Sequence, residues 1–141
     1  IAIAAHEVGH AIQDQQGDKR LATRTKMAPV VDKVARWSAA IISLSPVIGI
    51  ITRHPMPFSV LLFLGLSGFV ARMMFHAVTL PIEFDASFSK ALPLLREGNY
   101  VSQSNEKAVS HILRAAALTY VSAALADILN LGRWIVILLR R

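Results

Sequence analysis

The chain contains two long apolar stretches separated by a short proline-rich segment. Residues 38–52 carry no charged side chain, and residues 58–80 carry only Arg72. Stretches of this kind are typical of helices that cross a lipid bilayer, which need about 20 mainly apolar residues. With their flanks, they predict helices over residues 30–52 and 58–80, joined by a turn. Such a hairpin places its two open ends on the same side of a membrane.

A further helix is predicted over residues 1–17. It is apolar on nearly every side, which is typical of a buried helix, and Gly17 is suited to end it. Residues 17–26 are polar and basic, so the pattern predicts a loop or an interfacial segment there. Pro29 would then open the next helix, because proline is well tolerated at a first helical position.

Beyond the hairpin, residues 81–92 lead towards a C-terminal helical region over residues 106–139. The pattern leaves open whether this last region crosses the membrane. The predicted fold is therefore all-α and integral to the membrane, with a single domain over residues 1–141. In it, the helix at residues 1–17 packs at the membrane interface against the hairpin and a further C-terminal helix.

Composition supports a membrane protein and excludes several classes of site. The hydrophobic fraction is 54% and the charged fraction 17%, and the chain has no cysteine, which excludes disulfides and thiolate metal ligands. The net charge of +6 is spread along the chain beside apolar stretches. This pattern favours anionic lipid headgroups over nucleic acid as the partner. The chain starts at Ile1 without an initiating methionine, so we expect the C-terminal portion of a longer protein.

The first predicted helix carries the chemistry. His6 and His10 are four residues apart and therefore lie on one helix face, with Glu7 beside them. This is the H-E-x-x-H arrangement, in which two neutral imidazoles bind Zn²⁺ and the carboxylate acts as a general base towards water. A chance arrangement would leave a costly carboxylate unpaired in a buried helix. The motif therefore predicts a zinc site.

A catalytic zinc site needs a third protein ligand and one open position. No histidine follows at the spacing H-E-x-x-H-x-x-G-x-x-H, so the third ligand must come from a distant segment. The hairpin returns residues 80–87 to the membrane side that holds the motif. Glu83 and Asp85 in that segment are the two carboxylates that topology alone nominates.

Three segments together carry a family resemblance: HEVGHAIQ, LPIEFDAS and RAAALTYVSAAL. In this order and at these separations, the chain resembles the bacterial neutral zinc metallopeptidases of the YugP type, an integral-membrane family. The resemblance covers nearly the whole chain. It implies that His6 and His10 are zinc ligands, that Glu7 is the base and that Glu83 is the third ligand. Ser87 stands where a wider group of membrane peptidases has an aspartate.

The spacing of polar residues also favours Glu83 over Asp85. Glu83 continues a stripe on one helix face that is formed by Arg72, His76, Thr79, Glu83 and Ser87. Residues two apart on a helix point about 200° apart, so only one of the two carboxylates can face the metal. The longer glutamate side chain also spans the gap between two packed helices better.

The leading hypothesis is a membrane-embedded zinc endopeptidase of the bacterial plasma membrane that hydrolyses peptides or membrane proteins. Two alternatives are a non-catalytic membrane scaffold or metal-binding module, and an ion or metal transporter that uses Arg72, His76 and Asp127. The intact Glu7 argues against a purely structural site, which has no use for a base. The donor to the oxyanion is left open among Tyr120, His76 and His111. The sequence indicates neither the physiological substrate nor the oligomeric state.

The distribution of charge predicts the orientation of the site. Six basic residues precede the first apolar stretch, and Arg53 alone lies in the predicted turn. The positive-inside rule therefore places the site on the cytoplasmic face. Because the chain has no cysteine, Asp18→Cys and Pro55→Cys can each be labelled uniquely. In intact cells an impermeant thiol reagent should label position 55 and not position 18, and the reverse pattern would contradict this orientation.

Overall fold

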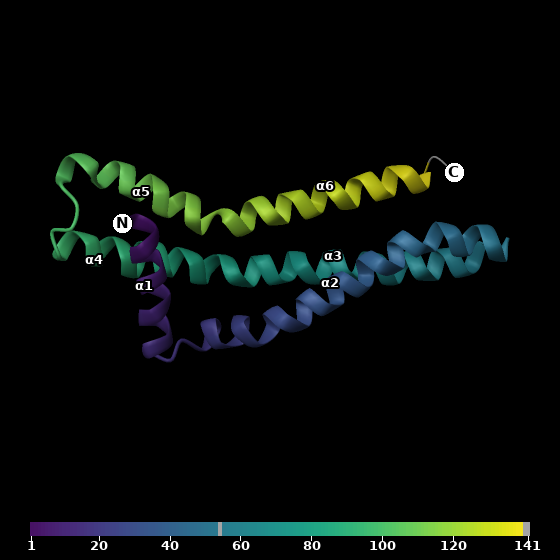
Figure 1. Cartoon of the computed structure of the whole chain (residues 1–141), viewed down its shortest axis with the longest axis horizontal. Helices are drawn as coiled ribbons and strands as arrows, with labels where there is room; N and C mark the ends of the chain where they lie inside the picture. The colour runs from purple at the N-terminus through teal and green to yellow at the C-terminus, as the bar shows by residue number, and fades with distance from the viewer. Residues whose placement is uncertain (54, 140–141) are drawn as a thin grey trace. The chain divides into compact units, whose positions relative to one another are not determined.

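The described residues form helices joined by short connections, as the computed structural model in Figure 1 shows. The structure describes residues 1–53 and 55–139, without the side chains of residues 55–59, 134 and 137–139. No β-strand lies among them, so the predicted all-α fold is confirmed. The elements are α1 (Ala2–Gln15), α2 (Lys19–Thr52), α3 (Pro55–Phe84), the π-helix η1 (Asp85–Ala91), α4 (Leu92–Glu97), α5 (Gln103–Ala117) and α6 (Thr119–Leu139).

The chain divides into two compact units. The first consists of Ile1–Thr25 and His76–Ala123, and it contains the H-E-x-x-H helix together with the segment predicted to supply the third ligand. The second consists of Lys26–Phe75 and Ala124–Arg141, and it contains most of the predicted hairpin.

Helix α1 ends where the sequence predicts, but it buries only one face. Gly17 adopts a positive φ of 66°, and the N–H of Asp18 donates to the carbonyl of Gln13, which satisfies the last turn of the helix. The side chains of Ile1, Ile3 and Val8 are exposed. The prediction of a helix buried on every side was therefore wrong, because small residues and the two histidines make up the packed face.

A loop or an interfacial segment is predicted over residues 17–26, but this stretch is helical from Lys19 onward, where α2 begins, so the loop is wrong. Asp18 caps this helix by accepting the backbone N–H of Arg20 at 2.7 Å. The side chain of Arg20 also hydrogen-bonds Asp18 and is the main reason that the pKa of Asp18 is lowered to about 2. Pro29 lies inside α2 rather than at its start, which costs the helix one backbone hydrogen bond but does not end it.

Helix α3 continues through Pro81 and passes directly into η1. A π-helix is rare, and its wider turn often marks a functional site. The stripe predicted for this helix is buried in the first unit, where Thr79, Glu83 and Ser87 are all at most 3% exposed. The continuous helix thus carries Glu83 and Ser87 into the packed interior beside α1.

The first unit is held together by the packing of α1 against η1, α4 and α5. Figure 1 shows α1, in purple, crossing beside this part of the chain. At the closest approach, a Cβ atom on Gly9 would lie 2.3 Å from the backbone carbonyl oxygen of Ala86. The apolar core next to this contact consists of Ala2, Ala5, Ala91, Leu92, Leu95, Val109 and Leu113.

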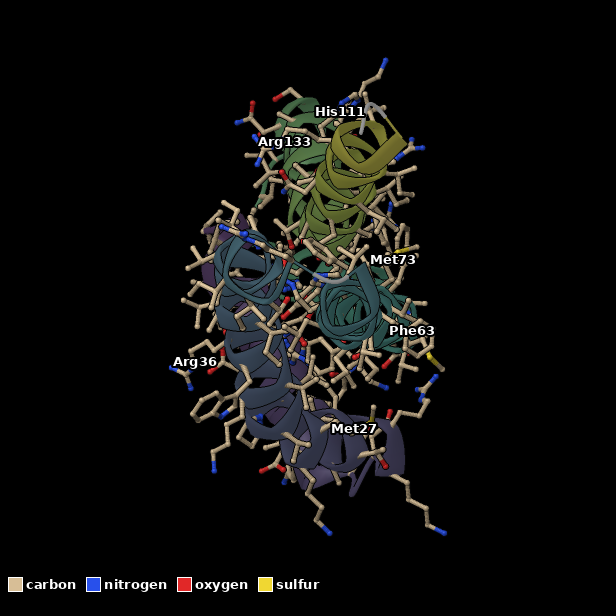
Figure 2. All side chains as sticks on the ribbon, turned by 90° about the vertical axis from the view of Figure 1, so that its right-hand side faces the viewer. Met27, Arg36, Phe63, Met73, His111 and Arg133 are labelled. Carbon is tan, nitrogen blue, oxygen red and sulfur yellow. The ribbon has the colours of Figure 1, made fainter. Side chains whose placement is uncertain are left out.

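In the second unit, small residues allow α2 and α3 to pack closely. Gly65 lies against the side chain of Ile42, and Gly68 lies against Ser38. The side chain of Phe63 is 77% exposed, and Figure 2 shows it and Arg36 pointing away from the hairpin. An outward apolar surface of this kind suits contact with lipid.

The buried carboxylate of Asp127 on α6 pairs with Arg72 on α3, with 3.0 Å between Oδ2 and Nε. Two of the residues considered for a transporter therefore neutralise each other within the second unit.

Within residues 1–53 and 55–139, two helical segments are long and apolar enough to cross a membrane, Lys19–Thr52 and Val60–Glu97. A third is available if α5 and α6 form one span that is broken at Leu118. The predicted helical region over residues 106–139 is thus two helices. Within the predicted turn, His54 lies outside the described residues.

The contact at Gly9 generates a stability prediction. Helix propensity alone would favour alanine over glycine by about 1 kcal/mol. In Gly9→Ala, however, the added methyl group meets backbone that cannot rotate away, and such overpacking typically costs about 1–3 kcal/mol. We expect a lower midpoint of thermal unfolding, followed by circular dichroism in detergent. Gly132→Ala is the control, since a Cβ there meets nothing within 4 Å, and its midpoint should not fall.

Candidate metal centre

Three side chains from two helices converge in the first unit. His6 and His10 project from α1 with ring centroids 4.8 Å apart, and Glu83 projects from the end of α3. Glu83 Oε2 lies 3.1 Å from His6 Nε2 and 3.3 Å from His10 Nε2. One potential ligand atom of each residue lies within 4.8 Å of the other two. The three residues that the sequence nominated as metal ligands are therefore close together.

The outer nitrogen of His6 is held by Ser87. The Ser87 hydroxyl donates to the backbone carbonyl of Leu113 at 3.2 Å, so its oxygen accepts the Nδ1–H of His6 at 2.9 Å. This arrangement assigns the ring proton to Nδ1 and leaves the lone pair of Nε2 facing Glu83. Ser87 thus fixes the tautomer that a metal-binding histidine requires.

Gln13 performs the same task for His10. Its amide nitrogen donates to the carbonyl of Ile82 at 2.9 Å and to Asp85 Oδ2 at 2.8 Å. The amide oxygen therefore faces His10 Nδ1, at 2.9 Å, and accepts a hydrogen bond from the N–H group there. Gln13 is completely buried, so the amide orientation is well determined by its partners.

These orientations turn a lone pair of each histidine towards a carboxylate oxygen. Two acceptors 3.1 Å apart repel each other unless a positive charge lies between them. A proton on His10 Nε2 would supply that charge and donate to Glu83, and this hydrogen bond is the main reason that the pKa of His10 is raised. Two imidazole nitrogens and one carboxylate oxygen are a donor set that fits Zn²⁺ with an open fourth position.

A cavity of about 490 Å³ opens onto the three residues. Its lining consists of Ile3, His6, Glu7, His10, Leu21, Arg24, Glu83, Ala116, Thr119 and Tyr120. Of the three proposed oxyanion donors, Tyr120 lines this cavity, whereas His76 and His111 do not. The ring of His76 lies 5.7 Å from that of Tyr120, and His111 is exposed on α5, where Figure 2 labels it.

The sequence model of the family described as "Putative neutral zinc metallopeptidase" matches residues 1–139. The chain belongs to this family. Among curated proteins, it is 35% identical over 139 residues to the "Putative membrane protease YugP" of Bacillus subtilis (strain 168). That alignment covers 99% of this chain and 58% of the relative, so the chain spans less than two thirds of the relative's length. No solved structure matches the chain.

Two residues beside the group of three, Gln13 and Arg24, are not predicted from the sequence. Gln13 stands three residues after His10, which places it on the same helix face. Arg24 lies in the stretch predicted as a loop or interfacial segment, and its guanidinium lies 3.1 Å from Glu83 Oε1. The spacing of Leu21 and Arg24 would have placed both on one face, had the segment been recognised as helical.

Asp85, the alternative third ligand, lies outside the group of three. It accepts the hydrogen bond from Gln13, and Arg20 Nη2 lies 4.0 Å from its Oδ2 atom. Asp85 therefore contacts Gln13, which holds His10, and it is not one of the three residues whose potential ligand atoms lie together.

Comparison of two variants tests this assignment of roles. Glu83→Gln removes the anionic ligand and should weaken zinc binding by several orders of magnitude. Asp85→Asn leaves all three ligands in place and should cost about 10–100-fold at most, as is usual for a residue behind a ligand. Competition with a chromophoric chelator measures both affinities. A larger loss in Asp85→Asn than in Glu83→Gln would reverse the roles given to the two carboxylates.

Proposed function

We propose that this chain forms the catalytic part of a membrane-embedded zinc endopeptidase. The observation that carries the proposal is the convergence of His6, His10 and Glu83 at a cavity that Glu7 also lines. Membership of a zinc metallopeptidase family and two helices able to span a membrane support it. The substrate class that we propose is a peptide or a membrane protein.

The three ligand residues would hold Zn²⁺, and Ser87 and Gln13 would keep the two imidazoles in the required tautomer. Bound Zn²⁺ supplies Lewis-acid chemistry, which polarises the scissile carbonyl and makes water more acidic. Glu7 is exposed to the cavity one residue after His6, where it can accept a proton from the attacking water. It then returns that proton to the leaving amine, so that a peptide bond and a water molecule become an acid and an amine.

Tyr120 is the group that we assign to the carbonyl oxygen of the substrate. It shares the cavity with Glu7, and Arg24 Nη2 donates a hydrogen bond to its hydroxyl oxygen. Donation from a cation polarises the phenol and strengthens the hydrogen bond that its O–H can donate to a developing negative charge. The apolar part of the cavity wall, formed by Ile3, Leu21 and Ala116, gives room for an apolar substrate side chain.

We further propose that the site lies at the cytoplasmic face of the membrane, on the basis of the basic residues that precede the first apolar stretch. The metal-binding scaffold remains the second candidate function. It differs from the peptidase in one testable respect, because a scaffold has no use for the carboxylate of Glu7.

Glu7→Gln separates the two. The amide of the new glutamine cannot accept a proton from water, so the rate of hydrolysis of an internally quenched peptide should fall about 10²–10⁴-fold. Zinc content should remain that of the parent protein, because Glu7 is not one of the three ligands. The assay uses the full-length protein in detergent, with Asp14→Asn on the same helix as the control for loss of a carboxylate. An undiminished rate in Glu7→Gln would exclude the proposed mechanism.

A further inference from the structure

Arg24 occupies an unusual place for a basic residue near a membrane. It lies in the first turns of α2, and its side chain is only 22% exposed. Its guanidinium carbon lies 5.4 Å from the centre of the Tyr120 ring, and Nη2 hydrogen-bonds the Tyr120 hydroxyl. The side chain is therefore directed into the first unit and not towards lipid headgroups.

The two oxygens of Glu83 have different partners, and Arg24 is the partner of one of them. Oε1 lies 3.1 Å from Arg24 Nη2, whereas Oε2 lies within 3.3 Å of both histidine Nε2 atoms. The carboxylate is thus held at both ends, by a cation on one side and by the imidazoles on the other. With a side-chain exposure of 4%, it has little room to turn.

The difference between the two oxygens matters for metal binding, because a carboxylate can bind a metal ion with one oxygen or with both. Binding through both oxygens would use the position that a zinc peptidase needs for water or substrate. Among the described residues Oε1 makes no hydrogen bond, so its contact with Arg24 is an ion pair, which attracts this oxygen towards the guanidinium and away from the histidines. The same nitrogen, Nη2, hydrogen-bonds the Tyr120 hydroxyl, and this bond holds the guanidinium in place beside Glu83.

We propose that Arg24 is a positioning residue that restricts Glu83 to metal coordination through Oε2 alone. The inference rests on the proposed function, and it adds a residue from outside the three sequence motifs to the site. A simpler role would be charge compensation, in which any cation near Glu83 suffices. The two roles predict different results for Arg24→Lys, because lysine supplies the positive charge but not the planar guanidinium.

The experiment compares Arg24→Gln and Arg24→Lys with the parent protein, all full length and in detergent. Arg36→Gln is the matched control. It removes the same charge from the same helix, but Arg36 is 71% exposed and pairs with Asp32. Circular dichroism establishes that each variant keeps its helical content.

Two readouts are independent of catalysis. Zinc affinity is measured by chelator competition, and the visible absorption of Co²⁺-substituted protein reports the coordination number, because four-coordinate Co²⁺ absorbs much more strongly than five- or six-coordinate Co²⁺. Arg24→Gln should weaken zinc binding about 10–100-fold and reduce the Co²⁺ absorption. Arg24→Lys should recover part of the affinity without the parent spectrum, and Arg36→Gln should match the parent in both.

The outcomes separate this inference from the proposed function. If the parent protein binds zinc and Arg24→Gln shows the same affinity and Co²⁺ spectrum, the positioning role is wrong and the metal site stands. Full recovery of the spectrum by Arg24→Lys would also overturn it, in favour of charge compensation. If the parent protein binds no zinc, the proposed function fails and the role of Arg24 fails with it.

Discussion

The first unit depends on the placement of one buried carboxylate, that of Glu83. A charge removed from water costs several kcal/mol unless partners surround it, and here the partners come from other helices of the first unit. The two histidines come from α1, Arg24 comes from the start of α2, and Tyr120 stands behind Arg24 at the start of α6. Four separate segments therefore meet around Glu83: the end of α3, which carries it, and parts of α1, α2 and α6. The same place is suited to a metal ion.

Close backbone packing makes that placement possible. Gly9 lies between the two histidines in sequence, and the backbone of Ala86 occupies the space that a Cβ atom would need there. The π-helix η1 supplies Ala86 and Ser87 on the face that meets α1. Glycine at this position thus has a packing role: it lets α1 approach until Ser87 can reach His6.

The parts of the site that the sequence predicted are those fixed by local spacing. His6, Glu7 and His10 follow from helix periodicity alone, and Glu83 followed from the polar stripe together with the family resemblance. Helix spacing can place Gln13 and Arg24 on the faces that carry the site, but it does not reveal their distant partners Asp85 and Glu83, and for this reason their roles were missed. The helical start of α2 was missed for a different reason, since a proline and a basic composition outweighed the cap at Asp18.

The partners behind the two histidines are neutral, and this has a chemical consequence. Ser87 passes its hydrogen bond to a backbone carbonyl, and Gln13 separates His10 from the carboxylate of Asp85. A carboxylate bonded directly to a ligand histidine makes the ring a stronger electron donor, whereas a hydroxyl or an amide does so less. The Arg24 cation withdraws further charge from Glu83. With weaker donors around it, a Zn²⁺ ion held by these residues would keep more of its own positive charge, which is the property that activates water and a carbonyl group.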